Sequence, residues 1–196
     1  MSLDKINIRN YILILIVIAA AATRFFHLDS FTSWFNFTPI GAIAMFGGAY
    51  YKNRIKAYLI PLVILFCSDL ILNYTVYYNM EGKFDAAIWT YLSFMLMVTV
   101  GRYMKKVNVW TVIGGSLACV FIHWIVSDIS AVMMAGSMYP RTFAGYLLAL
   151  QNAIPWERNL LVSTLVYSLV MFGGFEYAKS KFPALQLNNK AELQHA

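Results

Sequence analysis

The chain has 196 residues, of which 60% are hydrophobic, 16% are aromatic and only 12% are charged. Soluble domains average about 45–50% apolar and about 25% charged residues, so the composition excludes a soluble globular domain and a disordered chain. The apolar residues form continuous runs, which also excludes the alternating strands of an outer-membrane barrel. The net charge of +6 comes from basic residues in short loops beside these runs, a pattern of membrane topology rather than of nucleic-acid binding.

Six apolar runs follow one another, and each is a predicted membrane helix. The first, residues 11–26 (YILILIVIAAAATRFF), comes after a short basic head with Lys5 and Arg9. A basic head before an apolar run also fits a cleaved signal peptide. The membrane-like sequence downstream favours an uncleaved first helix instead.

The second run, residues 37–51 (FTPIGAIAMFGGAYY), is short and has Pro39 in its first turn, where a helix accepts proline. Its small residues recur three or four positions apart and share one helix face: Gly41, Ala44, Gly47 and Gly48. This nearly bare face is predicted to let a neighbouring helix approach closely.

The other four predicted spans are residues 57–74, 86–104, 107–129 and 156–178. Residues 142–153 (TFAGYLLALQNA) are too short to span and are expected to lie at the surface or fold back. The polar residues 179–196 are expected to form a disordered cytoplasmic tail. The prediction is therefore an all-α polytopic membrane protein, with a single domain of six transmembrane helices over residues 1–178.

The basic residues predict the orientation of these helices. With both termini on one side, that side holds 11 of the 15 basic residues: Lys5, Arg9, Lys52, Arg54, Lys56, Arg102, Lys105, Lys106, Lys179, Lys181 and Lys190. By the positive-inside rule this side is cytoplasmic. We therefore expect a multi-pass protein of the bacterial inner membrane with both termini in the cytoplasm.

Most other ionisable groups are expected toward the outer ends of the helices, which leaves the cytoplasmic halves plain and apolar. Ionisable groups at membrane depth are costly and usually line a cavity or pair with each other. The candidate substrate-binding residues at this outer end are Arg24, Trp34, Asp69, Asn73, Trp89, His123, Asp128, Arg141 and Glu157.

Three predicted helices carry polar stripes. Their members are Asp69 and Asn73 on the third helix, Ser116, Cys119, His123 and Ser127 on the fifth, and Glu157, Thr164 and Ser168 on the sixth. If the stripes face one another, they form a water-accessible cup that is open to the outside. Tryptophans around its rim would suit a small ligand with a flat ring.

Each feature also has a purely structural interpretation. The tryptophans fit an interfacial aromatic belt, and the Ser and Thr stripes fit contacts between helices. Asp69 would pair with Arg24 or Arg158 to hold the bundle together. Glu157 would complement the dipole of its helix, and His123 would be a hydrogen-bonded residue inside the bundle.

Signals for an enzyme are weak. The chain has no P-loop and no metal-ligand spacing, so we expect no ATP hydrolysis by this chain, no metal and no cofactor. Asp69 and Asp128 are both expected on the outer side, which keeps an intramembrane aspartyl hydrolase open as an alternative. The prediction remains a protein without enzymatic activity.

Six helices with internal termini and an outward polar cup resemble the substrate-binding S components of energy-coupling-factor (ECF) vitamin transporters. Residues 36–51 (NFTPIGAIAMFGGAYY) and 61–72 (PLVILFCSDLIL) are similar to an uncharacterised bacterial family of proposed transport proteins that are considered S-component-like. This specific similarity covers roughly the first 75 residues. The remainder matches only in spacing and topology.

The resemblance implies a membrane subunit that captures a small vitamin-like or nucleobase-like molecule at the outer face. It implies a lid over residues 27–36, ending at Asn36, and substrate contacts near Trp89, His123, Asp128, Arg141 and Glu157. It also implies an energising membrane partner with ATPases.

The first helix departs from this family, because its small residues lie near mid-membrane and its cytoplasmic half is bulky. Whether the chain docks on an energising partner is therefore open. The bare face of the second helix is another surface for such docking, and solitary transport without a partner is the alternative. Some solitary relatives bind cobalamin through a cysteine. Cys67 would serve only if the ligand is a corrinoid, although it lies about 200° around the helix from Asp69.

Two further hypotheses stand beside capture of a substrate. One is a structural or assembly protein that binds no ligand and contacts a partner through the small-residue face of the second helix. The other is the hydrolase that would use Asp69 and Asp128.

Overall fold

The computed structural model describes residues 3–25, 36–75, 88–134 and 136–186. Within these ranges all regular secondary structure is helical. The elements are α1 (Leu3–Ala22), the 3-10 turn η1 (Thr23–Phe25), α2 (Ile40–Tyr50), α3 (Arg54–Thr75), α4 (Ile88–Tyr103), α5 (Val109–Ser127), α6 (Ile129–Met133), α7 (Phe143–Lys181) and the 3-10 turn η2 (Pro183–Leu185).

The chain is a multi-pass membrane protein. Four segments are long and apolar enough to cross a bilayer: Ile8–Phe25, Arg54–Tyr74, Val109–Met133 and Phe143–Lys181. Large apolar side chains lie exposed on these segments, as lipid contact requires, among them Leu15, Val63, Phe121 and Val170. The other two predicted spans are shorter than the roughly 20 residues of a full crossing, with 16 residues in α4 and 11 in α2.

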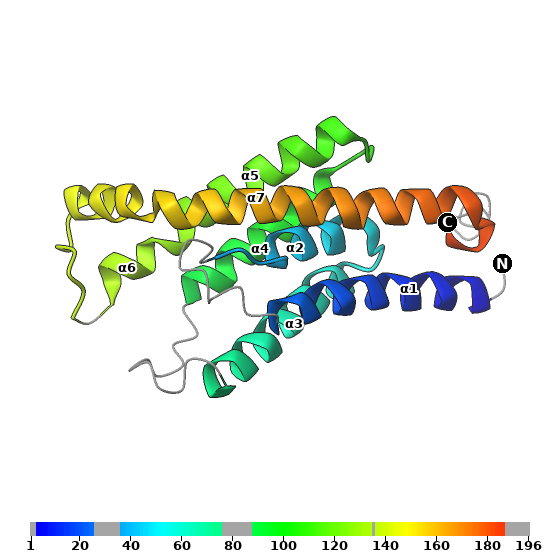
Figure 1. Ribbon diagram of the computed structural model, residues 1–196, viewed down its shortest axis with the longest axis horizontal. Coiled ribbons are helices and arrows are strands. Elements are labelled where there is room, and N and C mark those ends of the chain that lie inside the picture. The colour runs from blue at the N-terminus through cyan, green and yellow to red at the C-terminus, as the bar shows by residue number, and fades with distance from the viewer. Residues whose placement is uncertain (1–2, 26–35, 76–87, 135, 187–196) are drawn as a thin grey trace.

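Successive long helices alternate in direction, so that α1 begins and α7 ends at the same end of the bundle (Figure 1). The turn η2 packs against α1 there. The α2–α3 and α4–α5 connections also lie at this end, and most basic residues of the described ranges lie on or beside these segments. We call it the basic end, and the other the opposite end.

Helix α2 is the centre of the bundle. Ten of its eleven residues are buried, and it packs against α4, α3, α7, α5 and α1. At about 1.5 Å per residue it is only about 16 Å long, roughly half the hydrocarbon core. Because its small-residue face is covered from within, the expectation that this face could dock a partner is wrong.

The glycines of α2 allow the close approach that they predict, but they meet three different helices and do not all share one face. A Cβ atom on Gly48 would lie 2.1 Å from the carbonyl oxygen of Val98 in α4, and one on Gly101 would lie 2.1 Å from that of Met45. On the other sides of α2, Gly47 abuts Pro61 of α3 and Gly41 abuts Thr164 of α7. The backbones of α2 and α4 therefore touch directly.

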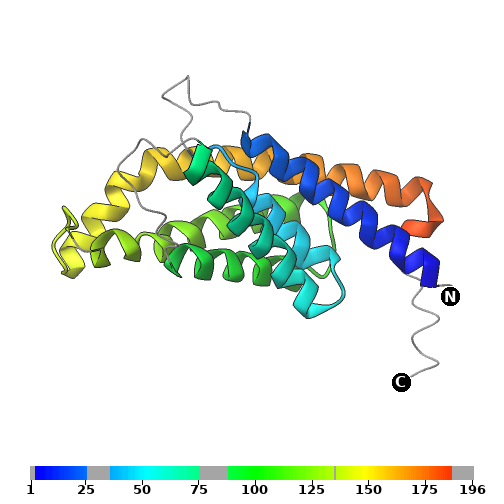
Figure 2. The same ribbon diagram turned by 90° about the horizontal axis from the view of Figure 1, so that it is seen from below.

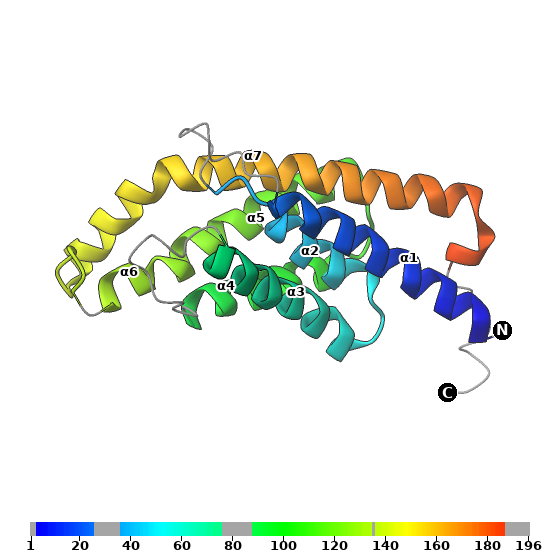
Figure 3. The same cartoon turned by 60° about the horizontal axis from the view of Figure 1, so that its bottom comes forward.

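The predicted break between residues 142–153 and residues 156–178 does not occur. Both segments belong to α7, a single helix of 39 residues that starts at the N-cap Thr142 and contains Pro155. Proline removes one backbone hydrogen bond but does not have to end a helix. Figures 2 and 3 show the N-terminal part of α7 bending toward α6, which fits a kink near this proline.

The helical structure also runs past residue 178. Helix α7 continues to Lys181, and Leu185 of η2 is only 1% exposed. Residues 179–185 are thus part of the packed bundle rather than of a disordered tail. The rest of the predicted tail, from residue 187 on, lies outside the described residues.

Candidate functional site

Two hydrogen bonds hold the N-terminal part of α7 against α5 at the opposite end. The indole Nε1 of Trp124 donates to the carbonyl oxygen of Leu150 at 2.9 Å. The hydroxyl of Tyr146 donates to the carbonyl oxygen of Ile125 at 2.6 Å. They fix the place where α5, α6 and α7 surround a cavity.

This cavity has a volume of about 340 Å³, and we call it the Glu157 cavity. Its polar lining residues are Asn36, His123, Asp128, Tyr139, Asn152 and Glu157. Its other lining residues are Ala131, Ala149, Ala153 and Trp156. The volume lies within the roughly 300–1,000 Å³ of small-molecule sites.

A hydrogen-bonded pair lies at the boundary between α5 and α7. The Nδ1 of His123 is 2.9 Å from Oε1 of Glu157, and both side chains are largely buried. When Glu157 is ionised its carboxylate only accepts, so the donor in that state is His123. The ring of Phe94 from α4 lies beside the imidazole, with centroids 5.6 Å apart.

Two carboxylate oxygens of the Glu157 cavity have no hydrogen-bond partner among the described residues. They are Oε2 of Glu157 and Oδ2 of Asp128, and both atoms are buried. A buried polar atom without a partner costs about 1–3 kcal/mol, and more when it is charged. The cavity is therefore rich in hydrogen-bond acceptors that are not used within the fold.

The cavity brings together four of the predicted binding residues: Asn36, His123, Asp128 and Glu157. Asn36 has φ of 68°, a left-handed conformation that asparagine adopts more readily than most residues. Tyr139 and Asn152, whose side chains hydrogen-bond at 3.2 Å, were not among the predicted residues. No helical spacing of polar residues indicated this pair, because Tyr139 lies in a loop and Asn152 precedes Pro155.

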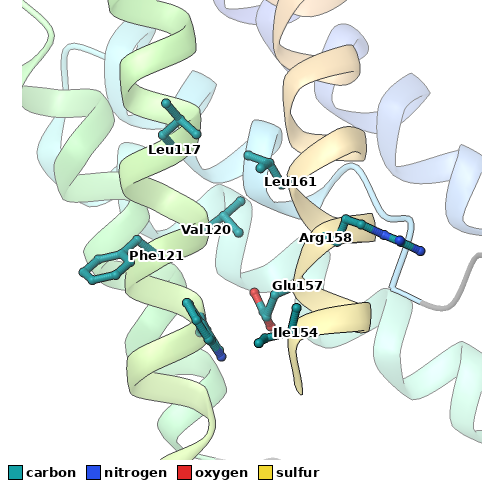
Figure 4. A pocket seen from close by; sticks show the side chains of 8 residues that line it. Leu117, Val120, Phe121, Ile154, Glu157, Arg158 and Leu161 are labelled. Carbon is teal, nitrogen blue, oxygen red and sulfur yellow. The ribbon is translucent and has the colours of Figure 1, made fainter. Parts of the chain in front are cut away.

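A second, apolar groove reaches Glu157 from the other side. It has a volume of about 280 Å³ between α5 and α7, and its lining includes Leu117, Val120, Phe121 and Leu161. Figure 4 shows Glu157 pointing into the space between the two helices, while Arg158 extends away from α5. Glu157 is thus the polar group shared by both openings.

Arg24 and Asp69 form a separate cluster between η1 and α3. The Nη2 of Arg24 donates to Oδ1 of Asp69 at 2.7 Å, and its Nη1 donates to the hydroxyl of Ser68. The cluster lines none of the cavities described here. Asp69 therefore pairs with Arg24, as its structural interpretation predicted. Among the described residues, the α3 stripe lines neither the Glu157 cavity nor the apolar groove.

The remaining predicted site residues lie elsewhere. Asn73 donates to the backbone oxygen of Asp69 in its own helix, and Arg141 donates to the backbone oxygen of Met133. Trp89 lies half-buried in the first turn of α4 and outside the Glu157 cavity. Trp34 lies outside the described residues.

The hydroxyls of the α5 stripe serve local structure, since Ser116 and Ser127 donate to backbone oxygens of their own helix. On α7, Thr164 packs against Gly41 of α2, and the hydroxyls of Thr164 and Ser168 are buried without a hydrogen-bond partner among the described residues. Cys67 is exposed on α3, away from the Glu157 cavity. In the part of the chain that the structure describes, no group of three His, Cys, Asp or Glu side chains is placed to hold a metal.

The expectation that the helix halves at the basic end are plain and apolar is wrong. Arg9 is only 6% exposed there, and the hydroxyl of Tyr50 donates to Glu176 at 2.7 Å. The signal was in the sequence, because Glu176 is a carboxylate inside a predicted span and calls for a partner.

The chain matches one protein family over residues 4–185. It belongs to DUF6580, a family of unknown function. No curated protein and no solved structure matches it. The match covers every helix of the bundle, so the Glu157 cavity lies wholly inside the part that defines the family.

Proposed function

We propose that this protein is a membrane subunit that captures a small vitamin-like or nucleobase-like molecule from the outer face for uptake. The observation that carries the proposal is the Glu157 cavity, with two buried carboxylate oxygens that are unpartnered among the described residues. A fold that needed these groups only for packing would be expected to give both oxygens a hydrogen-bond partner, because a buried acceptor without one is costly.

The chemistry of the lining suggests the class of ligand. Carboxylates accept hydrogen bonds and attract positive charge, so the ligand should present N–H donors or a cationic nitrogen. Trp156 and Tyr139 offer aromatic surface for a flat ring. A protonated or amino-substituted heterocycle of vitamin size meets both requirements.

The proposal includes an orientation in the membrane. The basic end lies in the cytoplasm and the Glu157 cavity faces outside, by the positive-inside rule. Both termini are then cytoplasmic and the chain crosses six times, with α2 and α4 as the short crossings. The alternating helix directions (Figure 1) support an even number of crossings.

Likeness to the S components of ECF transporters is part of this proposal. The support is a single helical bundle with a polar cavity at the end away from the basic loops. Uptake would then require the bundle to reorient or rock, with energy from a partner. The separation of Asp69, engaged by Arg24, from Asp128 favours binding over hydrolysis by two carboxylates.

The first test is mass spectrometry of small molecules that are released from the gently purified protein. A nitrogen-rich compound at near-stoichiometric amount is expected, and adding it back should raise the thermal unfolding temperature. Glu157→Gln keeps the side-chain volume and an acceptor for His123 but removes the charge. This variant should fold and lose the compound.

Arg158→Gln is the matched control, because Arg158 is exposed, points away from α5 (Figure 4) and borders the apolar groove but not the Glu157 cavity. It should retain the compound. If the wild-type protein carries nothing and no member of a panel of vitamins and nucleobases raises its unfolding temperature, capture is refuted. Equal retention by Glu157→Gln would move the site away from the Glu157 cavity.

A further inference from the structure

A larger cavity, of about 760 Å³, lies at the basic end. We call it the Arg9 cavity. It is formed where α1, the end of α2, the α4–α5 connection, the end of α7 and η2 meet. Its charged lining residues are four bases and one acid: Arg9, Lys105, Lys106, Lys179 and Glu176.

Arg9 is the buried base of this cavity. Its side chain is 6% exposed, and its guanidinium carbon lies 5.7 Å from the ring centroid of Phe175. Its Nε has no hydrogen-bond partner among the described residues. A buried cation with an unused donor is costly unless an anion reaches it.

The one carboxylate of the lining is already engaged. Glu176 accepts from the hydroxyl of Tyr50 at 2.7 Å and pairs with Nζ of Lys179 at 2.6 Å. Against this single negative charge stand four positive ones, so a surplus of three positive charges remains. Lys105 and Lys106 line the cavity and are exposed.

We propose that the Arg9 cavity binds a phosphate group, carried either by an anionic phospholipid or by a free phosphate anion. The planar fork of arginine matches phosphate oxygens with two parallel hydrogen bonds, and lysines add point charge. The volume exceeds that of a bare anion and lies within the range for small-molecule ligands. Basic pockets between membrane helices bind phospholipid headgroups in this way.

The test compares two double variants at the same end of the bundle. Lys105→Gln with Lys106→Gln removes two exposed charges from the cavity. Arg54→Gln with Lys56→Gln removes two exposed charges from the start of α3, outside the cavity. All four side chains are exposed, so both proteins should fold, and a general loss of positive charge affects them equally.

One arm is native mass spectrometry from nanodiscs that contain phosphatidylglycerol and phosphatidylcholine. The wild-type protein and the α3 variant should retain phosphatidylglycerol. The Lys105 and Lys106 variant should bind it with an affinity at least about tenfold lower. The other arm measures the unfolding temperature in detergent with inorganic phosphate, against sodium chloride of equal ionic strength.

Retention of phosphatidylglycerol identifies the phosphate of a lipid headgroup, and a phosphate-specific thermal shift alone identifies a free anion. Neither effect in the wild-type protein, or equal effects in both double variants, overturns the proposal. The inference does not rest on capture at the Glu157 cavity. Glu157→Gln should leave phosphate binding unchanged, which separates failure of one proposal from failure of the other.

Discussion

Arg24 and Asp69 show how two charged side chains neutralise each other inside a membrane bundle by forming an ion pair. The side chains are 13% and 23% exposed, and their ion pair is 2.7 Å long. The hydroxyl of Ser68 gives Arg24 a second acceptor. A pair of this kind stabilises chiefly because breaking it leaves one charge uncompensated.

Asp69→Asn is expected to destabilise the fold by about 3 kcal/mol, because it leaves the Arg24 guanidinium without its counter-ion. Arg24→Leu should have a similar cost. The double variant Arg24→Leu with Asp69→Leu should lose less than the two single variants together. Thermal unfolding in detergent measures all three, with Lys56→Gln as the exposed control.

Additive losses of stability would contradict the coupling of Arg24 with Asp69. If the losses of the single variants add in the double variant, the side chains are not coupled. The residues alone left Arg24 and Arg158 as equal partners for Asp69. The ion pair that Arg24 forms with Asp69, where α1 packs beside α3, decides between them.

At the scale of elements, the crossing of α2 and α4 determines the shape of the bundle. Spacing of small residues predicted a close neighbour for α2, and this is confirmed by the contacts of Gly48 and Gly101. The partner helix could not be named from spacing, because a bare face fits any helix. The same covering of α2 removed the docking surface expected on it.

Gly48→Ala should destabilise the protein by about 1–3 kcal/mol, because its Cβ would meet the Val98 carbonyl oxygen and force the backbones apart. Gly114→Ala is the matched control within a helix, since a Cβ there would meet nothing within 4 Å. That change should be neutral or stabilising by up to about 1 kcal/mol. Thermal unfolding of both variants in the same detergent checks the difference, and equal effects would refute the close crossing.

The whole molecule is polarised from end to end. One end carries the Glu157 cavity, with carboxylate oxygens that no described residue hydrogen-bonds, and the other carries the Arg9 cavity with its surplus of bases. The positive-inside rule then relates this polarity to the membrane. Orientation is therefore a property that can be tested without knowing any ligand.

Single cysteines in a background of Cys67→Ala and Cys119→Ala test the orientation. Met138→Cys lies at the opposite end, where Met138 is 85% exposed, and Lys181→Cys lies at the basic end. A membrane-impermeant maleimide applied to intact cells should label the first and not the second. Lys181→Cys should label only after the cells are permeabilised.

The reverse pattern would show the opposite orientation. Labelling of both positions from outside would place both ends of α7 on the outer side, so that α7 would not cross the membrane, against its length and apolar composition. Either result would refute internal termini.

The sequence by itself determined the class of protein, because bilayer solvation acts on composition and on runs of apolar residues. It also determined most helix positions and the charge asymmetry. It placed Asn36, His123, Asp128 and Glu157 among the candidates that the structure gathers around one cavity.

Only the tertiary structure decided which polar groups meet. The continuous α7 through Pro155, the buried Arg9 and the pairing of Asp69 all depend on which helix faces which. Spacing along one helix specifies a face, but the rotation of that face toward a particular neighbour comes from packing. Here the close contact of α2 with α4 sets the arrangement around which the other helices pack.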